Sequence, residues 1–417
     1  MELVEWTAIF TQMIKESPML LGELEIKNVL LYVADAVRFD SLHDQVSSLG
    51  TVYKTISQSI HTPPSFASIF TGCIPPRHGV YWFRDQLPEV DSVLTLSDHN
   101  CVFVHTSTGL ERTDGGLLAS ALNAGNASQI RLSDIEEPFV WAERAPGGHA
   151  PYGREPKSNA REYFEELLPA SEGEIKREYQ GGIKRDLSVF QNRLETLEDR
   201  GILKDTLIIY ASDHGDMLGE HGIVGHNGPI LPEVVYTPTV FVHPSLSAQC
   251  GGVMRNVDIF PTIRNVLGYE PLDYINGVPV HELEAPIQGT VHYCHGFDYG
   301  RNIGTDLGRF ESVVDPKYDQ HGLFDRTGGR VIRFNSSISQ LGIIGGNLAL
   351  SSIRSQYRHN AGKMAQKFMK RRWTCGFPRL DWETAKAEIV RTRDADRIGE
   401  ISTLGVNDEQ LEALGYI

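Results

Sequence analysis

The chain has 417 residues, of which 41% are hydrophobic, and its formal net charge is −15. This composition is typical of a globular protein that buries a large core and divides into two units. The acidic balance argues against nucleic-acid binding. The five scattered cysteines contain no C-x-x-C pair, so they predict neither a disulfide framework nor a zinc cluster.

Residues 1–27 are predicted to form an amphipathic helix that leads into the first strand. The beginning of this segment is acidic where a signal peptide would be basic. No run of the chain reaches the roughly 18 apolar residues that a membrane-spanning helix needs. We therefore expect a cytoplasmic protein.

The first buried strand is predicted at residues 28–33 (NVLLYV), because the run is apolar without alternation. Asp35 follows the end of this strand. Ligands of open α/β sheets gather at the carboxyl ends of the strands, which makes Asp35 a candidate metal ligand. Arg38 lies one turn further on and either pairs with an internal carboxylate or contacts the substrate.

The segment 61–79 (HTPPSFASIFTGCIPPRHG) predicts a helix that begins near Thr62, because proline is favoured in the first helical turn. The dipole of that helix would favour negative charge at Thr62. A metal-bound hydroxyl in this place is a candidate nucleophile towards a phosphate or sulfate ester. The alternative is that Thr62 only caps the helix.

A second buried strand is predicted at residues 207–210 (LIIY), and it is followed by Asp213 and His214. A carboxylate and an imidazole are suitable ligands for a divalent cation. Gly215 permits a sharp turn where a Cβ would interfere. Parallel neighbouring strands would bring Asp213 close to Asp35, which predicts a metal site between them.

Strands and helices alternate over residues 28–285, including a helix near 170–199. This pattern predicts an α/β fold with a large mixed, mostly parallel sheet flanked by helices. From residue 286 onwards, the chain changes to short strand-like runs broken by Gly and Asp. We therefore predict a catalytic domain at 1–285 and a small subdomain at 286–417 with a basic helical tail.

The basic tail is an exception in an acidic chain. A basic helix with an apolar face can lie on an anionic membrane or bind a polyanionic substrate, and it can also be a solvated helix face. The tail spans residues 354–379 and contains Arg354, Arg358, Lys363, Lys367, Lys370, Arg371 and Arg372, with Phe368, Met369 and Trp373 between them.

Three segments together resemble the sulfatase branch of the alkaline phosphatase superfamily. They are NVLLYVADAVRFDSL at 28–42, TPPSFASIFTGCIPPRHGV at 62–80 and TLIIYASDHGDMLGEHG at 206–222. Weaker matches at 138–153, at 257–271 and in the terminal LEALGYI extend the resemblance over nearly the whole chain from residue 28. The resemblance implies an alkaline phosphatase/sulfatase-like fold, in which the strand-like runs of 286–417 form a small antiparallel sheet, and the metal-dependent hydrolysis or transfer of an ester group.

The resemblance breaks at the nucleophile. Sulfatases carry a Cys or Ser, oxidised to formylglycine, in a C/S-x-P-x-R motif before an A-S-x-x-T-G segment. In this register the chain has Thr62, which cannot become formylglycine, and Phe66 replaces the arginine. Cys73 begins a C-x-P-x-R string, but only after the helix, at a turn. The segment VFVHTSTGL also lacks the G-K-W-H-type run with which sulfatases grip the sulfate.

Threonine at this position resembles the phosphoryl-transferring relatives, which include the single-metal lipoteichoic acid synthases and phosphoethanolamine transferases. The chain is therefore predicted to be a metal-dependent hydrolase or transferase of phosphoric mono- or diesters, with Thr62 as the nucleophile. A sulfatase that works without formylglycine or through Cys73 is one alternative. A degenerate family member that binds a ligand without turnover is the other.

Carried over by the resemblance, Asp35, Thr62, Asp213 and His214 are the ligands of one divalent cation, which is Mg²⁺, Mn²⁺, Zn²⁺ or Ca²⁺. A second cation would need a further Asp and two His. Asp186 lies near the right place in the sequence, but Phe190 stands where a histidine is needed. The remaining candidates for second-site ligands are His226, His292, His295 and His321.

The resemblance also implies two histidines that face the substrate. His149 belongs to an H-x-P-Y element, and His226 lies where sulfatases carry a substrate-binding Lys or His. Either would protonate the leaving oxygen, and loop packing is the alternative for both. The expected partner is a small-molecule or a lipid- or glycan-linked phosphate or sulfate ester. The sequence leaves the oligomeric state open.

Overall fold

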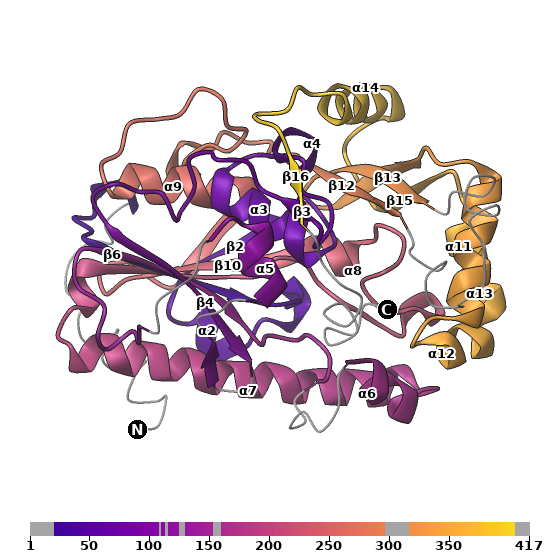
Figure 1. Ribbon diagram of the computed structural model, residues 1–417, viewed down its shortest axis with the longest axis horizontal. Helices are drawn as coiled ribbons and strands as arrows, with labels where there is room; N and C mark the ends of the chain where they lie inside the picture. Colours follow the sequence, from indigo (N-terminus) through magenta and orange to yellow (C-terminus); the bar gives the residue numbers. More distant parts are fainter. Residues whose placement is uncertain are drawn as a thin grey trace.

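The computed structural model describes residues 21–404, apart from 108–109, 113–115, 125–129, 153–159 and 297–316. Most of the helix predicted at residues 1–27 lies outside the described residues, and Leu21–Glu23 form a short 3-10 helix, η1. The molecule contains one large sheet with helices on both faces and one smaller sheet beside it (Figure 1). The predicted fold class is therefore confirmed.

The large sheet has the strand order β11-β2-β10-β7-β1-β6-β4-β5. β1 is parallel to β6 and β7, β4 is parallel to β6, and β2 is parallel to β11, whereas β10 is antiparallel to β2 and β7. The strands are β1 (Asn28–Ala34), β2 (Gly50–Ile56), β4 (Asn100–Ser107), β5 (Leu110–Arg112), β6 (Phe139–Ala145), β7 (Thr206–Ala211), β10 (Tyr236–Val242) and β11 (Gln249–Arg255).

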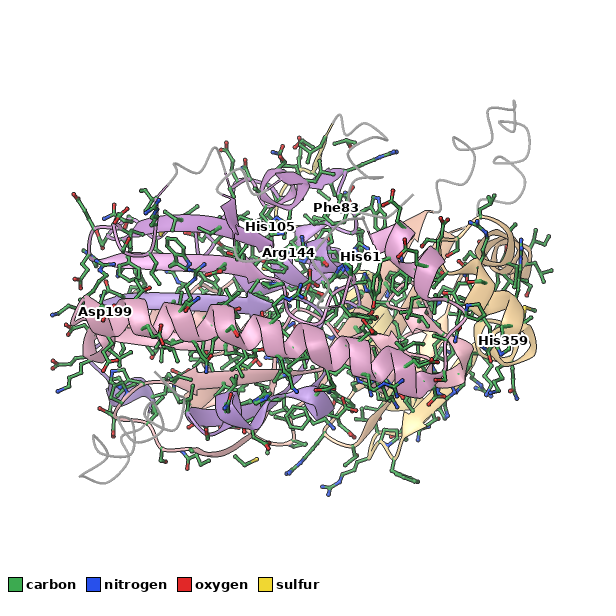
Figure 2. All side chains as sticks on the ribbon, turned by 90° about the horizontal axis from the view of Figure 1, so that it is seen from below. His61, Phe83, His105, Arg144, Asp199 and His359 are labelled. Carbon is green, nitrogen blue, oxygen red and sulfur yellow. The ribbon has the colours of Figure 1, made fainter. Side chains whose placement is uncertain are left out.

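The central strand β1 is buried on both faces, as its unbroken apolar run predicts. Leu30 and Tyr32 point into one core and Val29 and Leu31 into the other. The long helix α7 (Glu172–Asp199) packs on the first face. The helices α3 (Thr62–Thr71) and α9 (Ile259–Val266) pack on the second face. Figure 2 shows α7 running along the sheet, with Asp199 at its end.

The remaining elements are short. Within the described residues, no helix is both long enough and apolar enough to cross a bilayer. The further helices are α2 (Asp44–Ser47), α4 (Pro75–His78), α5 (Gly116–Ala121), α6 (Ala160–Leu167), α8 (Pro232–Val235), α11 (Ser337–Ala349), α12 (Arg354–His359), α13 (Ala361–Phe368) and α14 (Trp382–Arg393). The 3-10 turns and two-residue strands are η2 (Phe39–Ser41), η3 (Leu203–Asp205), η4 (Glu220–Gly222), η5 (Asn256–Asp258), η6 (Val280–Glu282), β3 (Asp85–Gln86), β8 (Met217–Leu218), β9 (Val224–Gly225) and β16 (Ser402–Thr403).

The predicted small sheet is present and is antiparallel throughout. Tyr293, Tyr318 and Phe324 on this sheet belong to the same core as Leu30 of β1, so the two sheets share one apolar layer. We retain 285/286 as the proposed boundary, which falls between η6 and β12. The strands of the small sheet are β12 (Gly289–Gly296), β13 (Lys317–Phe324), β14 (Gly328–Arg333) and β15 (Arg372–Gly376).

The prediction of a basic helical tail at residues 354–379 is wrong in part. The segment begins with the two short helices α12 and α13 but continues as the strand β15. Along β15 the buried Trp373 and Cys375 alternate with exposed neighbours, and this period of two is that of a strand. The indole N–H of Trp373 donates to the carbonyl of Ile230, 2.9 Å away, which fixes the strand against the large domain.

Candidate metal centre

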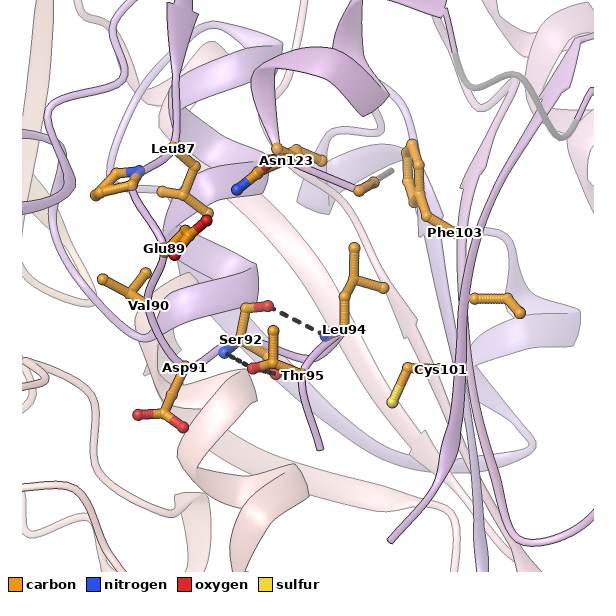
Figure 3. Close-up of a pocket in the computed structure, with 14 residues that line it drawn as sticks. Leu87, Glu89, Val90, Asp91, Ser92, Leu94, Thr95, Cys101, Phe103 and Asn123 are labelled. Atoms are coloured by element: carbon orange, nitrogen blue, oxygen red, sulfur yellow. Dashed lines mark hydrogen bonds between the residues drawn. The ribbon is translucent and has the colours of Figure 1, made fainter. Parts of the chain in front are cut away.

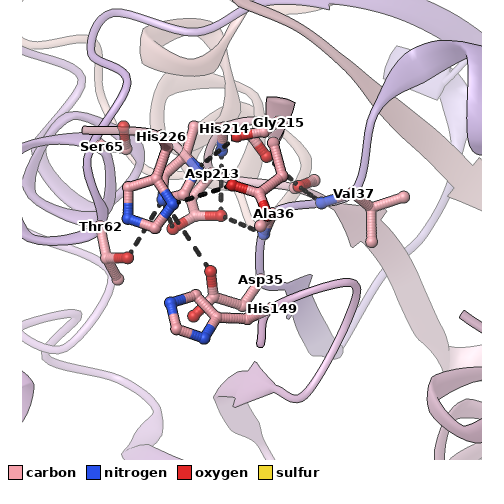
Figure 4. Close-up of polar contacts among 12 residues, drawn as sticks. Asp35, Ala36, Val37, Thr62, Ser65, His149, Asp213, His214, Gly215 and His226 are labelled. Carbon is pink, nitrogen blue, oxygen red and sulfur yellow. Dashed lines mark hydrogen bonds and ion pairs between the residues drawn. The ribbon is translucent and has the colours of Figure 1, made fainter. Parts of the chain in front are cut away.

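Two adjacent strands deliver the two aspartates. β1 and β7 pair in parallel up to Val33 opposite Ala211, and Asp35 and Asp213 each follow two residues after this last pair. Both carboxylates are buried. The ligand atoms of Asp35, Asp213 and His214 all lie within 4.8 Å of one another. The convergence predicted from the strand ends is therefore present (Figure 4).

Each aspartate uses one oxygen for hydrogen bonds and leaves the other without a donor. Asp35 Oδ2 accepts from Nε of Arg144 at 2.8 Å and also from its Nη2. Asp213 Oδ1 accepts from the backbone N–H groups of Ala36 and His214, at 3.0 and 2.9 Å. Asp35 Oδ1 and Asp213 Oδ2 are buried and accept no hydrogen bond from the described residues. Buried anionic oxygens without donors are costly unless a cation pairs with them, so these residues fit a bound divalent ion.

The ring of His214 is oriented towards the same point. Its Nδ1 lies 2.9 Å from the carbonyl oxygen of Gly215, and because a carbonyl only accepts, Nδ1 is the donor. Nε2 therefore keeps its lone pair. It lies 3.4 Å from Asp213 Oδ2 and 3.9 Å from Asp35 Oδ1. A backbone carbonyl that fixes the tautomer is a common feature of metal-binding histidines.

Thr62 is the first residue of α3, as predicted, and its hydroxyl faces the two aspartates. Oγ1 lies 3.1 Å from His214 Nε2, and the residue is fully buried. The N-cap of the helix is His61, so Thr62 does not cap it. Pro63 and Pro64 have no N–H, so the helix dipole, more than a set of amide donors, favours negative charge here.

The two carboxyl groups have opposite pKa shifts. Burial, and then the charge of Asp35, raise the pKa of Asp213 well above its usual range. Burial acts in the same direction on Asp35, but the guanidinium of Arg144 together with His149, His214 and His226 outweighs it and holds the pKa of Asp35 below its usual range. The two carboxylates repel each other, so Asp213 becomes negatively charged more readily when a cation lies between them. This is the behaviour expected of carboxylates that bind a cation.

The turn that covers Asp35 is held by Asp186. The backbone N–H of Gly147 donates to Asp186 Oδ1 at 2.9 Å, and the hydroxyls of Tyr32 and Tyr210 donate to the same carboxylate at 2.8 and 3.0 Å. A Cβ on Gly147, which has φ +55°, would lie 2.0 Å from the carbonyl oxygen of Asp35. Asp186 therefore anchors this turn and does not lie in the group that could hold the metal. Burial raises the pKa of Asp186 to about 6.

His149 and His226 lie beside the predicted metal ligands. The ring centroid of His226 is 4.3 Å from that of His214 and 5.5 Å from that of His149. His226 Nδ1 lies 3.1 Å from Asp216 Oδ1, and Asp216 Oδ2 accepts from the hydroxyl of Tyr152. Nε2 of both His149 and His226 is buried and has no partner among the described residues. Burial, together with the neighbouring histidines, lowers the pKa of His226 well below its usual value.

Arg38 is bound inside the protein. Its Nε donates to Asp40 and its Nη1 to Glu220, each at 2.9 Å. The internal pairing considered from the sequence is therefore the one observed, and substrate contact by Arg38 stays a prediction. Gly215 packs against this arginine, because an added Cβ would lie 3.0 Å from Arg38 Cγ and 2.1 Å from the carbonyl oxygen of Glu233. The expectation that a Cβ would interfere at Gly215 is therefore confirmed, while the bend of the chain is at Asp213.

The sequence analysis did not identify Arg144, Asp216 or Tyr152. Arg144 lies on β6 opposite Val33, and the charged pair Glu143–Arg144 inside a buried strand was the available signal. Asp216 and Tyr152 belong to the quoted segments DHGD and HAPY, but their contact joins distant parts of the chain. Figure 2 shows Arg144 beside His105, and the guanidinium lies 3.2 Å from His105 Nε2.

Cys73 is far from this centre. It follows α3, and ten helical residues at about 1.5 Å each separate it from Thr62 by roughly 15 Å. Cys73 is buried, and burial raises its pKa to about 11. Both facts disfavour a thiolate nucleophile.

Of the histidines considered for a second metal, His226 lies beside the Asp35 group, whereas His292 and His321 do not join it. His292 and His321 lie on the small sheet with their Nδ1 atoms 2.8 Å apart. His321 Nε2 is 2.7 Å from Asp319 Oδ1 and 3.5 Å from the Cys294 sulfur. The side chain of His295 is outside the described residues.

The hollow drawn in Figure 3 is a separate feature. Its lining includes Leu87, Ser92, Leu94, Cys101 and Phe103, and none of the predicted site residues. Cys101 is the second residue of β4, so the hollow lies towards the amino end of that strand. The candidate centre lies at the opposite, carboxyl ends of the parallel strands.

Comparisons with known proteins find similar sequences. The family model described as Sulfatase matches residues 127–269. The low-salt glycan biosynthesis sulfotransferase Agl7 of Haloferax volcanii is 28% identical in a 421-residue match that covers 95% of this chain and 98% of that protein. The multifunctional alkaline phosphatase superfamily protein PehA of Trinickia caryophylli is 36% identical over 78 residues, which are 18% of this chain and 15% of PehA.

Solved structures share the fold. A 2-O GAG sulfatase superimposes with a TM-score of 0.56 at 14% identity, covering 82% of this chain and 93% of that one. The phosphonate monoester hydrolase of Agrobacterium radiobacter gives a TM-score of 0.51 at 15% identity, covering 82% and 96%. The resemblance predicted from the three sequence segments is confirmed.

Proposed function

We propose that this sulfatase-like chain of the alkaline phosphatase superfamily is a metal-dependent enzyme that hydrolyses or transfers a phosphoric ester, with Thr62 as the nucleophile. The observation that carries the proposal is that His214 Nε2 lies 3.1 Å from Thr62 Oγ1 and also 3.4 and 3.9 Å from the donor-free oxygens of Asp213 and Asp35. These four residues would hold one divalent cation, Mg²⁺, Mn²⁺, Zn²⁺ or Ca²⁺. Such a cation lowers the pKa of a bound hydroxyl and offsets charge on the transferring group.

The protein side chains supply the remaining steps. Thr62 Oγ1 attacks the phosphorus in line, its hydroxyl proton passes to Nε2 of His149 or His226, the new O–P bond forms, and the bond from phosphorus to the leaving oxygen breaks. The leaving oxygen takes the electron pair and receives that proton from the same Nε2. A water or an acceptor alcohol then attacks the same phosphorus, loses its proton to that histidine, and releases Thr62, whose oxygen takes the proton back from the histidine. Burial lowers the pKa of His226, so its ring is neutral and Nε2 can accept the proton of the attacking water or alcohol.

The charge of the site favours an ester with a single negative charge. The carboxylates of Asp35 and Asp213, the guanidinium of Arg144 and a divalent cation together carry one net positive charge. A phosphodiester or a sulfate monoester has one negative charge at neutral pH, whereas a phosphate monoester approaches two. We therefore propose phosphodiesters as the preferred phosphoric esters.

A second candidate is sulfuryl transfer. It is favoured by the similarity to Agl7, a protein named as a glycan biosynthesis sulfotransferase, which extends over 95% of this chain. The substrate would then be a glycan-linked sulfate ester, and Thr62 would attack sulfur in the same way. This route needs no formylglycine, and it does not use Cys73, whose pKa is raised to about 11 by burial.

The two candidates are separated by one set of assays. Bis(4-nitrophenyl) phosphate, 4-nitrophenyl phosphate and 4-nitrophenyl sulfate are compared with each of the four cations and with a chelator. The protein is made with and without a formylglycine-generating enzyme. Turnover of the diester above the monoester, lost with the chelator, supports the first candidate. Turnover of the sulfate alone, independent of the maturation enzyme, supports the second. Sulfatase activity that needs the maturation enzyme contradicts both, and metal binding without any turnover favours a degenerate binding protein.

A further inference from the structure

One continuous part of this acidic chain contains no acidic residue. Residues 326–380 include no Asp and no Glu, although the whole chain has 54 of them and a net charge of −15. The basic residues in this part are Arg326, Arg330, Arg333, Arg354, Arg358, Lys363, Lys367, Lys370, Arg371, Arg372 and Arg379. Positive charge is therefore concentrated on the elements from β14 to the end of β15.

The same part of the chain exposes large apolar side chains. Of the six large hydrophobic residues that are exposed among the described residues, only Val278 lies elsewhere. Phe377 is 89% exposed, and Ile338 and Leu341, three residues apart on α11, are 61% and 57% exposed. Single exposed apolar residues are common on soluble proteins, whereas a cluster of them marks an interaction surface. The other two residues of this cluster are Leu350 and Met369.

Hydrogen bonds bring the charged and apolar groups together at both ends of α11. At its beginning, the backbone N–H of Arg333 donates to the carbonyl of Arg371, and the Arg333 side chain donates to the carbonyls of Lys370 and Ser336. Lys370 and Arg371 therefore lie beside the turn that bears Ile338. At the other end, Arg358 Nε donates to the carbonyl of Leu348 at 2.6 Å.

The helices α11, α12 and α13 pack against one another at one end of the molecule (Figure 1). Their exposed residues, with those at the beginning of β15, make up what we call the basic–apolar surface. Its members are Ile338, Leu341, Leu350, Arg358, Lys363, Met369, Lys370, Arg371 and Arg372.

We propose that the basic–apolar surface docks this protein onto an anionic lipid bilayer. Lys and Arg would pair with acidic headgroups while Ile338 and Leu341 enter the boundary between headgroups and acyl chains. A soluble polyanion would use the same charges but would gain nothing from the exposed apolar side chains, which is why a membrane fits better. Because no described helix can span a bilayer, the protein would lie on the surface.

The helices of this surface pack on the loop between β7 and β10, which carries part of the candidate centre. α12 and α13 pack on η4, and a Cβ on Gly222 would lie 2.3 Å from Cβ of Asn360. The indole N–H of Trp373 on β15 donates a hydrogen bond to the carbonyl of Ile230 in the same loop, which also contains His226. Docking would therefore hold the His226 loop close to the lipid surface. That consequence rests on the proposed function, whereas the docking itself does not.

The test is sedimentation of the full chain with vesicles. Vesicles of equal parts phosphatidylglycerol and phosphatidylcholine are compared with vesicles of phosphatidylcholine alone. We expect binding to the anionic vesicles only, and weaker binding as salt rises from about 0.1 to about 1 M, because the screening length falls from about 10 to about 3 Å. The triple variant Lys370→Gln, Arg371→Gln, Arg372→Gln should lower the partition coefficient on the order of 100-fold, since each basic residue near such a surface contributes about five-fold.

A matched control removes three exposed charges elsewhere. The triple variant Arg177→Gln, Lys184→Gln, Lys204→Gln changes the net charge equally and should bind as the unaltered chain does. A second variant, Ile338→Asn with Leu341→Asn, should lower vesicle binding while leaving the binding of heparin unchanged. Circular dichroism checks that each variant is folded. Absence of binding to anionic vesicles, or equal effects of the two triple variants, would overturn the proposal. Equal loss of heparin and vesicle binding in the Asn variant would point to a soluble polyanion.

Discussion

Asp35 and Asp213 each follow two residues after the last pair of two adjacent parallel strands, and each keeps one buried oxygen free of hydrogen bonds from the described residues. The other oxygen of Asp35 is bound by Arg144, and that of Asp213 by two backbone N–H groups. The donors thus fix both carboxylates without using the two oxygens that face Thr62 and His214. This division of roles is the basis of the first prediction.

Removing either free oxygen should abolish tight cation binding. Asp35→Asn and Asp213→Asn each replace an anionic ligand with a neutral amide. Loss of a residue that only supports a metal ligand weakens metal binding by up to about 100-fold, so loss of a ligand itself should raise the Kd for the cation by more than that. Isothermal titration calorimetry measures it. Asp186→Asn is the matched control, because Asp186 is equally buried but bonded to Gly147 and two tyrosines. Unchanged affinity in both ligand variants would contradict the site.

Thr62→Ala should lower kcat by roughly 10⁴- to 10⁶-fold, as expected when a nucleophile is removed. Thr62→Ser should keep partial activity because the hydroxyl remains. Mass spectrometry of a quenched reaction should find the transferred group on the peptide that contains Thr62. Full activity of Thr62→Ala would show that another residue is the nucleophile.

Cys73 should be unreactive and dispensable. It is buried, and its pKa of about 11 leaves it as the thiol at pH 8. Iodoacetamide should therefore label the exposed Cys250 before Cys73 in the folded chain, and Cys73→Ser should retain activity. Rapid labelling of Cys73, or loss of turnover in the serine variant, would revive the thiol as a nucleophile.

Asp216→Ala should lower activity through His226, because the Asp216 carboxylate holds Nδ1 of that ring at 3.1 Å. We expect a roughly 10- to 100-fold decrease in kcat, the usual effect of losing a group that orients a functional histidine. The decrease should be larger for substrates with poor leaving groups, since these depend most on protonation. Tyr152→Phe should have a smaller effect in the same direction. Equal losses across leaving groups would indicate a structural role only.

Asp186 should make the stability of the fold depend on pH. Burial raises its pKa from 3.8 to about 6, so the folded state binds this proton more tightly than the unfolded state does. The stabilisation by the bound proton is complete below pH 3.8 and is lost as pH rises through 6, a change of about 3 kcal/mol. Asp186→Asn cannot titrate. Urea unfolding of both proteins from pH 4 to 7 should show the variant becoming relatively more stable as pH rises, and parallel curves would contradict this.

Much of the fold and part of the candidate site could be predicted from local sequence. The unbroken apolar runs of β1 and β7 identified strands buried on both faces, and the proline pair after Thr62 identified the first residue of α3. In these segments the residues that determine the secondary structure lie within the element that they form. Because ligands gather where parallel strands end, the positions of Asp35, Asp213 and His214 followed from the same patterns.

The remaining parts of the site were decided by tertiary contacts. Arg144 reaches Asp35 across 109 residues of chain, and Tyr152 reaches Asp216 across 64, so no local pattern records either pair. The basic tail shows the same limit. Its residues from 372 form a strand because β14 offers a pairing edge and Trp373 a buried place, although the charge pattern suggested a helix. Local sequence specified the elements and the ligand types, whereas strand register and packing decided which side chains meet, because those contacts exist only after the chain has folded.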